Sequence, residues 1–280
     1  ASCAQTASCR NHSVANPATR QCAILPQPPP SRVGDRDVDW YRSYLIYDPA
    51  VSPHYEVLSV PDYYDGYWKH RVETSPHHLR MFSSRTWQWE ETTFLHEGEP
   101  VVAGRALSLS ERYGVYWQDA LYVYWHANAI TRILLTTKKY RLIQLPPKQP
   151  ATLYLGKSNK GVYCAYMEDS RIWIWLLNGS MDLAEYQVDW DSDNDDIVQI
   201  DDTLRTSLFR ILGFHPYKKV IFLEETMSKG VAYHWKSSKY QYLGRIYTES
   251  YREDASYQAS ITASFPYTPC WIDLLRGKHY

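Results

Sequence analysis

The chain has 280 residues, 44% of them apolar, and its 30 Lys and Arg against 31 Asp and Glu give a formal net charge of −1. This balance argues against a nucleic-acid binder, which normally carries a basic domain or stripe. No run approaches the roughly 18 apolar residues that cross a bilayer. The aromatic residues are unusual, because 25 Tyr and 11 Trp stand beside only 6 Phe. Tyr and Trp suit half-buried pleated surfaces, so the composition predicts an all-β protein.

One pattern recurs along the chain: a short apolar strand, a turn rich in Pro, Ser, Thr or Lys, and a second strand. The first two copies place Asn16-Pro17 and Asp48-Pro49 at the turn. This is the signature of a type I turn, because Pro presets φ and the Asx side chain bonds the turning backbone. A closing proline such as Pro61 is expected to end the second strand, since it cannot donate to the ladder. The copies cover residues 14–26, 45–61, 81–94, 133–146, 172–186 and 233–243.

A second kind of hairpin lies between these copies. It is clearest where two aromatic strands flank Gln118-Asp119, and similar hairpins cover 161–175 and 213–223. Together with the next copy of the first pattern, the Gln118-Asp119 hairpin gives four strands over 112–146, which is the content of one propeller blade. Turn spacings of about 32 to 57 residues bracket the roughly 40–50 residues of WD40 and kelch blades.

The expected fold is therefore all-β and β-propeller-like, with kelch-type blades of antiparallel strands in a single domain over 1–280. The ordered repeats are expected over about 11–273, with an N-terminal blade that is incomplete. Six turn motifs suggest about six blades, and residues 265–272 are the candidate for a last strand that pairs with the first blade.

Loops between the hairpins are the expected binding sites, because loops on a rigid scaffold carry specificity. The interface is predicted among residues 61–78, 96–111, 147–152 and 189–207. The first of these loops holds four aromatic residues of the kind that dominate binding hot spots, namely Tyr63, Tyr64, Tyr67 and Trp68. We take them as candidate partner-binding residues; the alternative is that they pack over the edge of a blade.

Residues 189–207 form an acidic segment that partly matches a calcium loop. Its aspartates at positions 1, 3, 5 and 12 of such a loop are Asp191, Asp193, Asp195 and Asp202. Asp196 stands where the loop requires Gly, and Asp202 where it requires Glu, so a solvated acidic loop between blades is favoured over a cation site.

Nothing else in the chain points to chemistry. His, Ser, Asp and Cys residues are present without the spacing of a metal site, a phosphate loop or a nucleophile elbow, so no enzyme, cofactor, metal or catalytic residue is predicted. His215, inside Gly-Phe-His-Pro-Tyr, is interpreted as a hydrogen-bonded turn residue. The five Cys lack a paired spacing and are read as free thiols in a reducing compartment, the cytoplasm or the nucleus.

Several segments together resemble the F-box-associated propeller region of plant F-box proteins, particularly the large grass families. They are residues 44–57, 82–86, 153–158, 213–218 and 264–271. The resemblance implies the substrate-recognition part of an SCF-type E3 ubiquitin ligase, in which an F-box docks a Skp1-type adaptor and thereby a cullin. The F-box expected ahead of the Asn16-Pro17 turn is absent from this chain, so those contacts are expected only in a longer parent. The alternative is a stand-alone interaction module; a propeller enzyme is the least supported reading.

Overall fold

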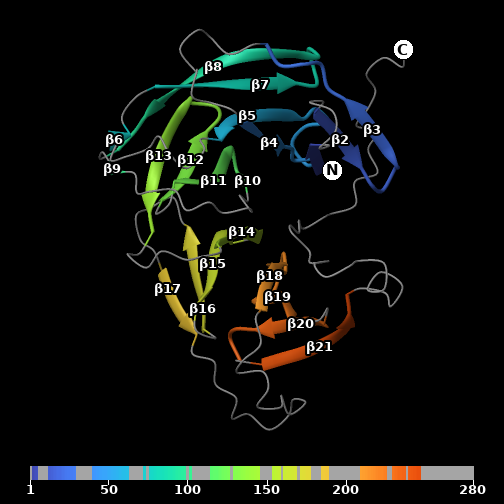
Figure 1. Ribbon diagram of the computed structural model, residues 1–280, viewed down its shortest axis with the longest axis vertical. Coiled ribbons are helices and arrows are strands. Elements are labelled where there is room, and N and C mark those ends of the chain that lie inside the picture. Colours follow the sequence, from blue (N-terminus) through green and yellow to red (C-terminus); the bar gives the residue numbers. More distant parts are fainter. Residues whose placement is uncertain are drawn as a thin grey trace. The chain divides into compact units, whose positions relative to one another are not determined.

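The computed structural model describes residues 2–5, 12–29, 40–62, 72–73, 76–98, 101–102, 114–126, 129–145, 153–158, 160–168, 171–177, 184–188, 209–225, 229–237 and 239–246. All regular secondary structure in these residues is β-strand (Figure 1). Contacts divide the chain into two compact units. The first consists of Ala1–Ser108, Tyr116–Pro147 and Tyr267–Tyr280, and the second of Leu109–Val115 and Lys148–Pro266.

The first unit begins with a three-stranded antiparallel sheet. Its order is β1 (Ser2–Gln5), β2 (His12–Asn16) and β3 (Gln21–Ile24). The Asn16 side-chain oxygen accepts a hydrogen bond from the Ala18 backbone N–H at 3.2 Å, which confirms the Asx turn. Strand β1 lies ahead of residue 11, where the ordered repeats were expected to begin. It was not predicted because Ser-Cys-Ala-Gln carries no β-branched or aromatic residue to signal a strand.

The first unit continues with an eight-stranded sheet in the order β10-β11-β12-β13-β8-β7-β5-β4. Its strands are β4 (Trp40–Ile46), β5 (Glu56–Asp62), β7 (His77–Ser83), β8 (Gln88–His96), β10 (Gly114–Trp117), β11 (Ala120–His126), β12 (Ala129–Leu134) and β13 (Lys139–Gln144). Two antiparallel meanders meet where β13 pairs in parallel with β8, over Lys139 with Leu95 and Tyr140 with His96. The four strands predicted over 112–146 form one of these meanders.

The copies of the turn motif at 45–61 and 81–94 share the other meander, as its β4–β5 and β7–β8 hairpins. The number of turn motifs therefore exceeds the number of meanders in the described residues. The prediction that Pro61 ends its strand is wrong, since β5 runs on to Asp62. Pro61 pairs with Tyr41 of β4, but the ladder from β5 to β7 stops at Ser59, so the missing N–H interrupts no bond on that side.

The second unit holds two four-stranded antiparallel sheets, each in the order of the chain (Figure 1). One contains β14 (Leu153–Ser158), β15 (Gly161–Glu168), β16 (Arg171–Leu177) and β17 (Ala184–Val188); the other contains β18 (Phe209–Phe214), β19 (Val220–Glu225), β20 (Lys229–His234) and β21 (Lys239–Arg245). A four-stranded antiparallel meander is the form of a propeller blade. The predicted fold class, all-β and β-propeller-like, is therefore confirmed.

Side chains along β5 alternate between two faces of the sheet and so contribute to two separate apolar cores in the first unit. Successive side chains of a strand point to opposite faces, so Leu58 and Val60 join a cluster with Phe94 and residues of β11 and β12. Tyr55 and Val57 face the other way and pack with Phe82 and with Val14 and Leu25 of the three-stranded sheet. The second cluster is what attaches that small sheet to the meander.

Three turns of the repeated motif end on a residue with left-handed backbone. Arg20 has φ 55°, Trp87 has φ 59° and Lys138 has φ 54°, and each immediately precedes the second strand of its hairpin. A side chain at positive φ crowds its own carbonyl, which costs about 1–2 kcal/mol relative to Gly. The sequence did not reveal this feature, because none of the three residues is Gly or Asn.

Replacing Arg20 by glycine is therefore expected to raise the free energy of unfolding by about 0.5–1 kcal/mol, after allowance for the extra freedom of glycine in the unfolded chain. Arg85→Gly is the matched control, because Arg85 is an exposed turn residue whose φ is not positive. Urea denaturation measures both variants. The prediction would be contradicted if Arg20→Gly lowered the free energy of unfolding by as much as Arg85→Gly.

Candidate functional site

The four predicted anchor residues Tyr63, Tyr64, Tyr67 and Trp68 lie outside the described residues. So do the predicted loops at 147–152 and 189–207, with the calcium-like aspartates, and the predicted last strand at 265–272. Their roles stay predictions. The structure does describe the strands that flank the aromatic segment: β5 ends at Asp62 and β7 begins at His77.

Two of the predicted interface segments meet at one end of the β4–β8 meander. Strand β6 (Val72–Glu73) lies in the connection from β5 to β7, and β9 (Val101–Val102) lies in the connection from β8 to β10. They pair antiparallel, Val72 with Val102 and Glu73 with Val101. This ladder joins 61–78 to 96–111, and we call the end of the meander where they meet the ladder end.

The opposite end of the same meander is closed by turn-to-turn hydrogen bonds. The Ser84 backbone N–H donates to the Tyr55 carbonyl at 3.0 Å, and the Tyr55 N–H donates to the Ser84 hydroxyl at 2.8 Å. Successive connections of an antiparallel meander alternate between its two ends. The β4–β5 and β7–β8 turns therefore share one end, and the two segments of the ladder end share the other.

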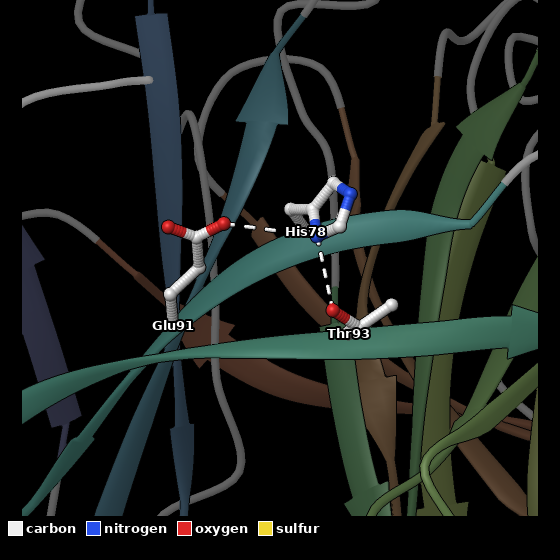
Figure 2. A network of polar contacts seen from close by, with 3 residues as sticks. All are labelled: His78, Glu91 and Thr93. Atoms are coloured by element: carbon white, nitrogen blue, oxygen red, sulfur yellow. Dashed lines mark hydrogen bonds and ion pairs between the residues drawn. The ribbon is translucent and has the colours of Figure 1, made fainter.

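A polar cluster of three side chains lies on β7 and β8 near the ladder end (Figure 2). His78 and Thr93 are cross-strand partners, and the Thr93 hydroxyl lies 3.0 Å from His78 Nδ1. Glu91 reaches the same nitrogen from one side, with Oε1 at 3.7 Å from Nδ1. His78 is half exposed, with 53% of its side chain accessible.

This geometry does not form a proton relay. In a Ser-His-Asp triad the carboxylate and the hydroxyl occupy different nitrogens of the imidazole, so that one orients the ring while the other exchanges a proton. Here both partners converge on Nδ1 of His78. The two contacts hold the His78 ring against the sheet and leave its Nε2 directed away from Glu91 and Thr93. This orientation suits a residue that contacts a binding partner.

Arg80 extends the polar surface along β7. Its guanidinium lies 4.3 Å from the centre of the Tyr41 ring and donates to the Tyr41 hydroxyl at 3.4 Å. His78 and Arg80 are two residues apart on one strand, so both lie on the same face of the sheet. Phe82 follows on that face and enters the apolar core. The face is thus polar towards the ladder end and apolar towards the turns.

A buried histidine lies where the polar part of this face meets its apolar part. His12 of β2 is 6% exposed, and its Nδ1 lies 2.9 Å from the Ser43 hydroxyl of β4. Burial lowers its pKa, because the charged imidazolium is poorly solvated there. The Trp89 indole N–H donates to the Pro26 carbonyl at 2.7 Å and adds a second polar link between the small sheet and β8.

Sequence reasoning identified the aromatic segment but missed this polar face. The available signal was the alternation His78-Leu79-Arg80, in which polar residues two apart enclose a buried leucine. In the sequence, His78 stands next to His77 at the end of the predicted interface segment 61–78. Its partners Glu91 and Thr93 become visible only when the register of β7 against β8 is known.

The interpretation of His215 as a turn residue is confirmed. Its Nδ1 accepts hydrogen bonds from the backbone N–H groups of Tyr217 and Lys218, both at 3.1 Å. Partial burial lowers its pKa, and the nearby charges of Lys218 and His234 lower it further. Protonation would remove the acceptor on which both hydrogen bonds depend.

The turn is therefore expected to lose stability in acid. A folded-state pKa below the unfolded value means that the contribution is fully present above about pH 6.5 and disappears as the pH falls through the lower folded value. His215→Asn keeps an acceptor without a titrating ring, so unfolding in urea at pH 5 and pH 7.5 should differ less than in wild type. His215→Ala should cost about 1 kcal/mol at pH 7.5. Identical pH profiles for wild type and His215→Asn would contradict this assignment.

Among the described residues, no group of three or more His, Cys, Asp or Glu side chains is placed to hold a metal ion. The described part of the chain also contains no helix long and apolar enough to cross a membrane.

No protein-family model matches the chain, and no curated protein matches it. Among solved structures, the crystal structure of HIRA(644-1017) is similar, with a TM-score of 0.37 and 13% sequence identity. The match covers 82% of this chain and 57% of that chain, so this chain spans less than two thirds of the HIRA structure. A likeness this weak identifies neither a partner nor an activity.

Proposed function

We propose that this chain is a protein-interaction module that binds its partner through the ladder end of the first unit. The observation that carries the proposal is the β6–β9 ladder, which brings the connection after β5 and the connection after β8 to one place. A binding surface made from two connections on a rigid sheet has the construction typical of loop-based recognition.

The composition of this end suits a protein partner. Tyr63, Tyr64, Tyr67 and Trp68 supply large amphipathic side chains, which dominate binding energy at interfaces. His78 and Arg80 lie on β7, the strand that follows this connection, and offer polar contacts. Protein interfaces commonly combine aromatic and polar side chains of these kinds.

The finer proposal is that this module selects the target of an SCF-type ubiquitin ligase in the cytoplasm or nucleus. Its support is the resemblance of segments such as 44–57 and 213–218 to the F-box-associated region of plant F-box proteins. A stand-alone interaction module is the second candidate. Co-purification of the full-length protein with a Skp1-type adaptor and a cullin separates them, because a stand-alone module would recover neither.

The binding surface is tested by proximity labelling in cells with matched variants. Changing Tyr63, Tyr64, Tyr67 and Trp68 together to serine should reduce the labelling of the proteins enriched by wild type by about tenfold or more, because each anchor contributes roughly 1–2 kcal/mol. Tyr242→Ser is the control, since Tyr242 is 53% exposed and lies on β21 of the second unit. An unchanged set of labelled proteins in the fourfold variant would remove the basis for this proposal.

A further inference from the structure

Three turns of the second unit carry lysine and no acidic residue. They are the β14–β15 turn with Lys160, the β18–β19 turn with Lys218 and Lys219, and the β20–β21 turn with Lys236, which is followed by Lys239 at the start of β21. The intervening sequences Ser-Asn-Lys-Gly, Phe-His-Pro-Tyr-Lys-Lys-Val and His-Trp-Lys-Ser-Ser-Lys contain neither Asp nor Glu. This is unusual in a chain whose formal net charge is −1.

A trio of aromatic rings holds these turns side by side. Tyr163 follows the first turn, Phe214 precedes the second, and Trp235 opens the third. The ring centres of Tyr163 and Phe214 are 5.4 Å apart, those of Tyr163 and Trp235 are 5.9 Å apart, and those of Phe214 and Trp235 are 6.0 Å apart. Because each ring contacts the other two, the three lysine-bearing turns lie at one end of the unit, which we call the lysine end.

Each turn is also fixed by its own hydrogen bonds. The Lys160 backbone N–H donates to the Ser158 hydroxyl at 3.2 Å, and the Ser237 N–H donates to the His234 carbonyl at 3.1 Å. His215 receives two backbone N–H groups in the middle turn. These hydrogen bonds hold the described backbone next to Lys160, Lys218 and Lys236, which lowers the entropy lost on association.

The charge at the lysine end is available for a partner. Lys160, Lys218 and Lys236 are exposed, and none of them forms an ion pair with another described residue. The carboxylates of Glu224 and Glu225 belong to the far end of β19, where Glu225 pairs with Lys229 at 3.5 Å. Burial, Lys218 and His234 together lower the pKa of His215, and the effect of the two basic neighbours agrees with a positive potential at this end.

We propose that the lysine end is a docking surface for an acidic polypeptide segment, separate from the ladder end of the first unit. Lysine point charges on ordered turns match carboxylates spaced along an extended chain, and the exposed Tyr217 offers an apolar contact among them. Nucleic acid fits less well, because phosphate recognition favours the forked guanidinium and these turns contain no arginine. A nucleic-acid binder also carries a broadly basic domain, whereas this chain is close to neutral.

Fluorescence anisotropy with a labelled twelve-residue peptide of alternating Asp and Glu, containing one central Leu, tests the proposal on the full chain. Wild type should bind with an affinity that falls as salt rises, because the contacts are exposed ion pairs. Lys160→Gln, Lys218→Gln and Lys236→Gln combined should weaken binding by about tenfold, since each exposed pair contributes a modest part. These surface changes should leave the circular dichroism spectrum unaltered.

The matched control is Arg20→Gln, Arg85→Gln and Lys138→Gln combined, which removes the same charge from turns of the first unit. This variant should bind the peptide like wild type. Absence of binding by wild type, or equal loss in the two triple variants, would overturn the assignment. Tighter binding of a twelve-nucleotide single-stranded DNA, lost in the lysine variant, would overturn it in favour of nucleic acid. The fourfold serine variant used to test the ladder end should still bind the acidic peptide. The two proposals can therefore fail independently of each other.

Discussion

Replacing Phe82 with alanine is expected to lower the free energy of unfolding by about 3–5 kcal/mol, the usual cost of emptying a buried phenylalanine site. Phe82 has no exposed surface. Its ring lies 5.3 Å from that of Trp87, 5.5 Å from that of Trp89 and 6.3 Å from that of Tyr55. The cavity cannot close easily, because these three neighbours are themselves held by strand and turn hydrogen bonds.

The loss should also loosen the three-stranded sheet. Val14 and Leu25 of that sheet pack into the same cluster as Phe82, so the cluster is shared between the small sheet and the β4–β8 meander. Urea denaturation followed by tryptophan fluorescence reports the change directly, since Trp87 and Trp89 border the cavity. Leu95→Ala on β8, where the side chain is 53% exposed, should stay within about 0.5 kcal/mol of wild type. A Phe82→Ala loss no larger than that of the control would contradict this account of the core.

The sequence predicts the local hairpins well because their turns carry their own chemistry. Asn16 and Asp48 each accept the backbone N–H two residues on, and such bonds form without help from distant parts of the chain. The Gln118-Asp119 turn, with φ of 44° and 63°, was located from the aromatic strands on either side rather than from its residues. Two-residue hairpin turns of this geometry usually contain Gly.

Features set by distant partners were not predictable in the same way. The parallel pairing of β8 with β13 covers only Leu95 with Lys139 and His96 with Tyr140, too little to leave a pattern. The polar face around His78 depends on the strand register, and the lysine end depends on a ring trio drawn from three hairpins. The loop at 61–78 was predictable as an aromatic segment, but its pairing with the connection at 96–111 through the β6–β9 ladder was not.

Gly156 is an example of a strand residue whose identity depends on a contact with a segment distant in the sequence. It lies in β14, and a Cβ atom added there would overlap Cδ2 of the Phe214 ring and approach Cε1 of Tyr154 to 3.0 Å. Phe214 belongs to β18 in the adjoining sheet of the same unit. Glycine inside a strand often marks the close approach of another segment, but the sequence alone does not name the segment.

Gly156→Ala is therefore expected to destabilise the protein by about 1–3 kcal/mol, the cost of forcing extra volume into a packed site. The Phe214 ring cannot swing away, because the rings of Tyr154, Tyr163 and Trp235 surround it at centre distances of 5.8, 5.4 and 6.0 Å.

Two further variants make the prediction specific to this contact. Gly213→Ala, where the nearest atom is the Tyr154 hydroxyl at 3.3 Å, should cost distinctly less. Phe214→Leu combined with Gly156→Ala should lose less stability than the sum of the two single changes, because the smaller side chain removes the overlap. Urea unfolding of wild type, Gly156→Ala, Phe214→Leu and the double variant completes this double-mutant cycle. Strict additivity would mean that Gly156 is required for some reason other than its approach to Phe214, and that the two sheets of the second unit are not packed through this contact.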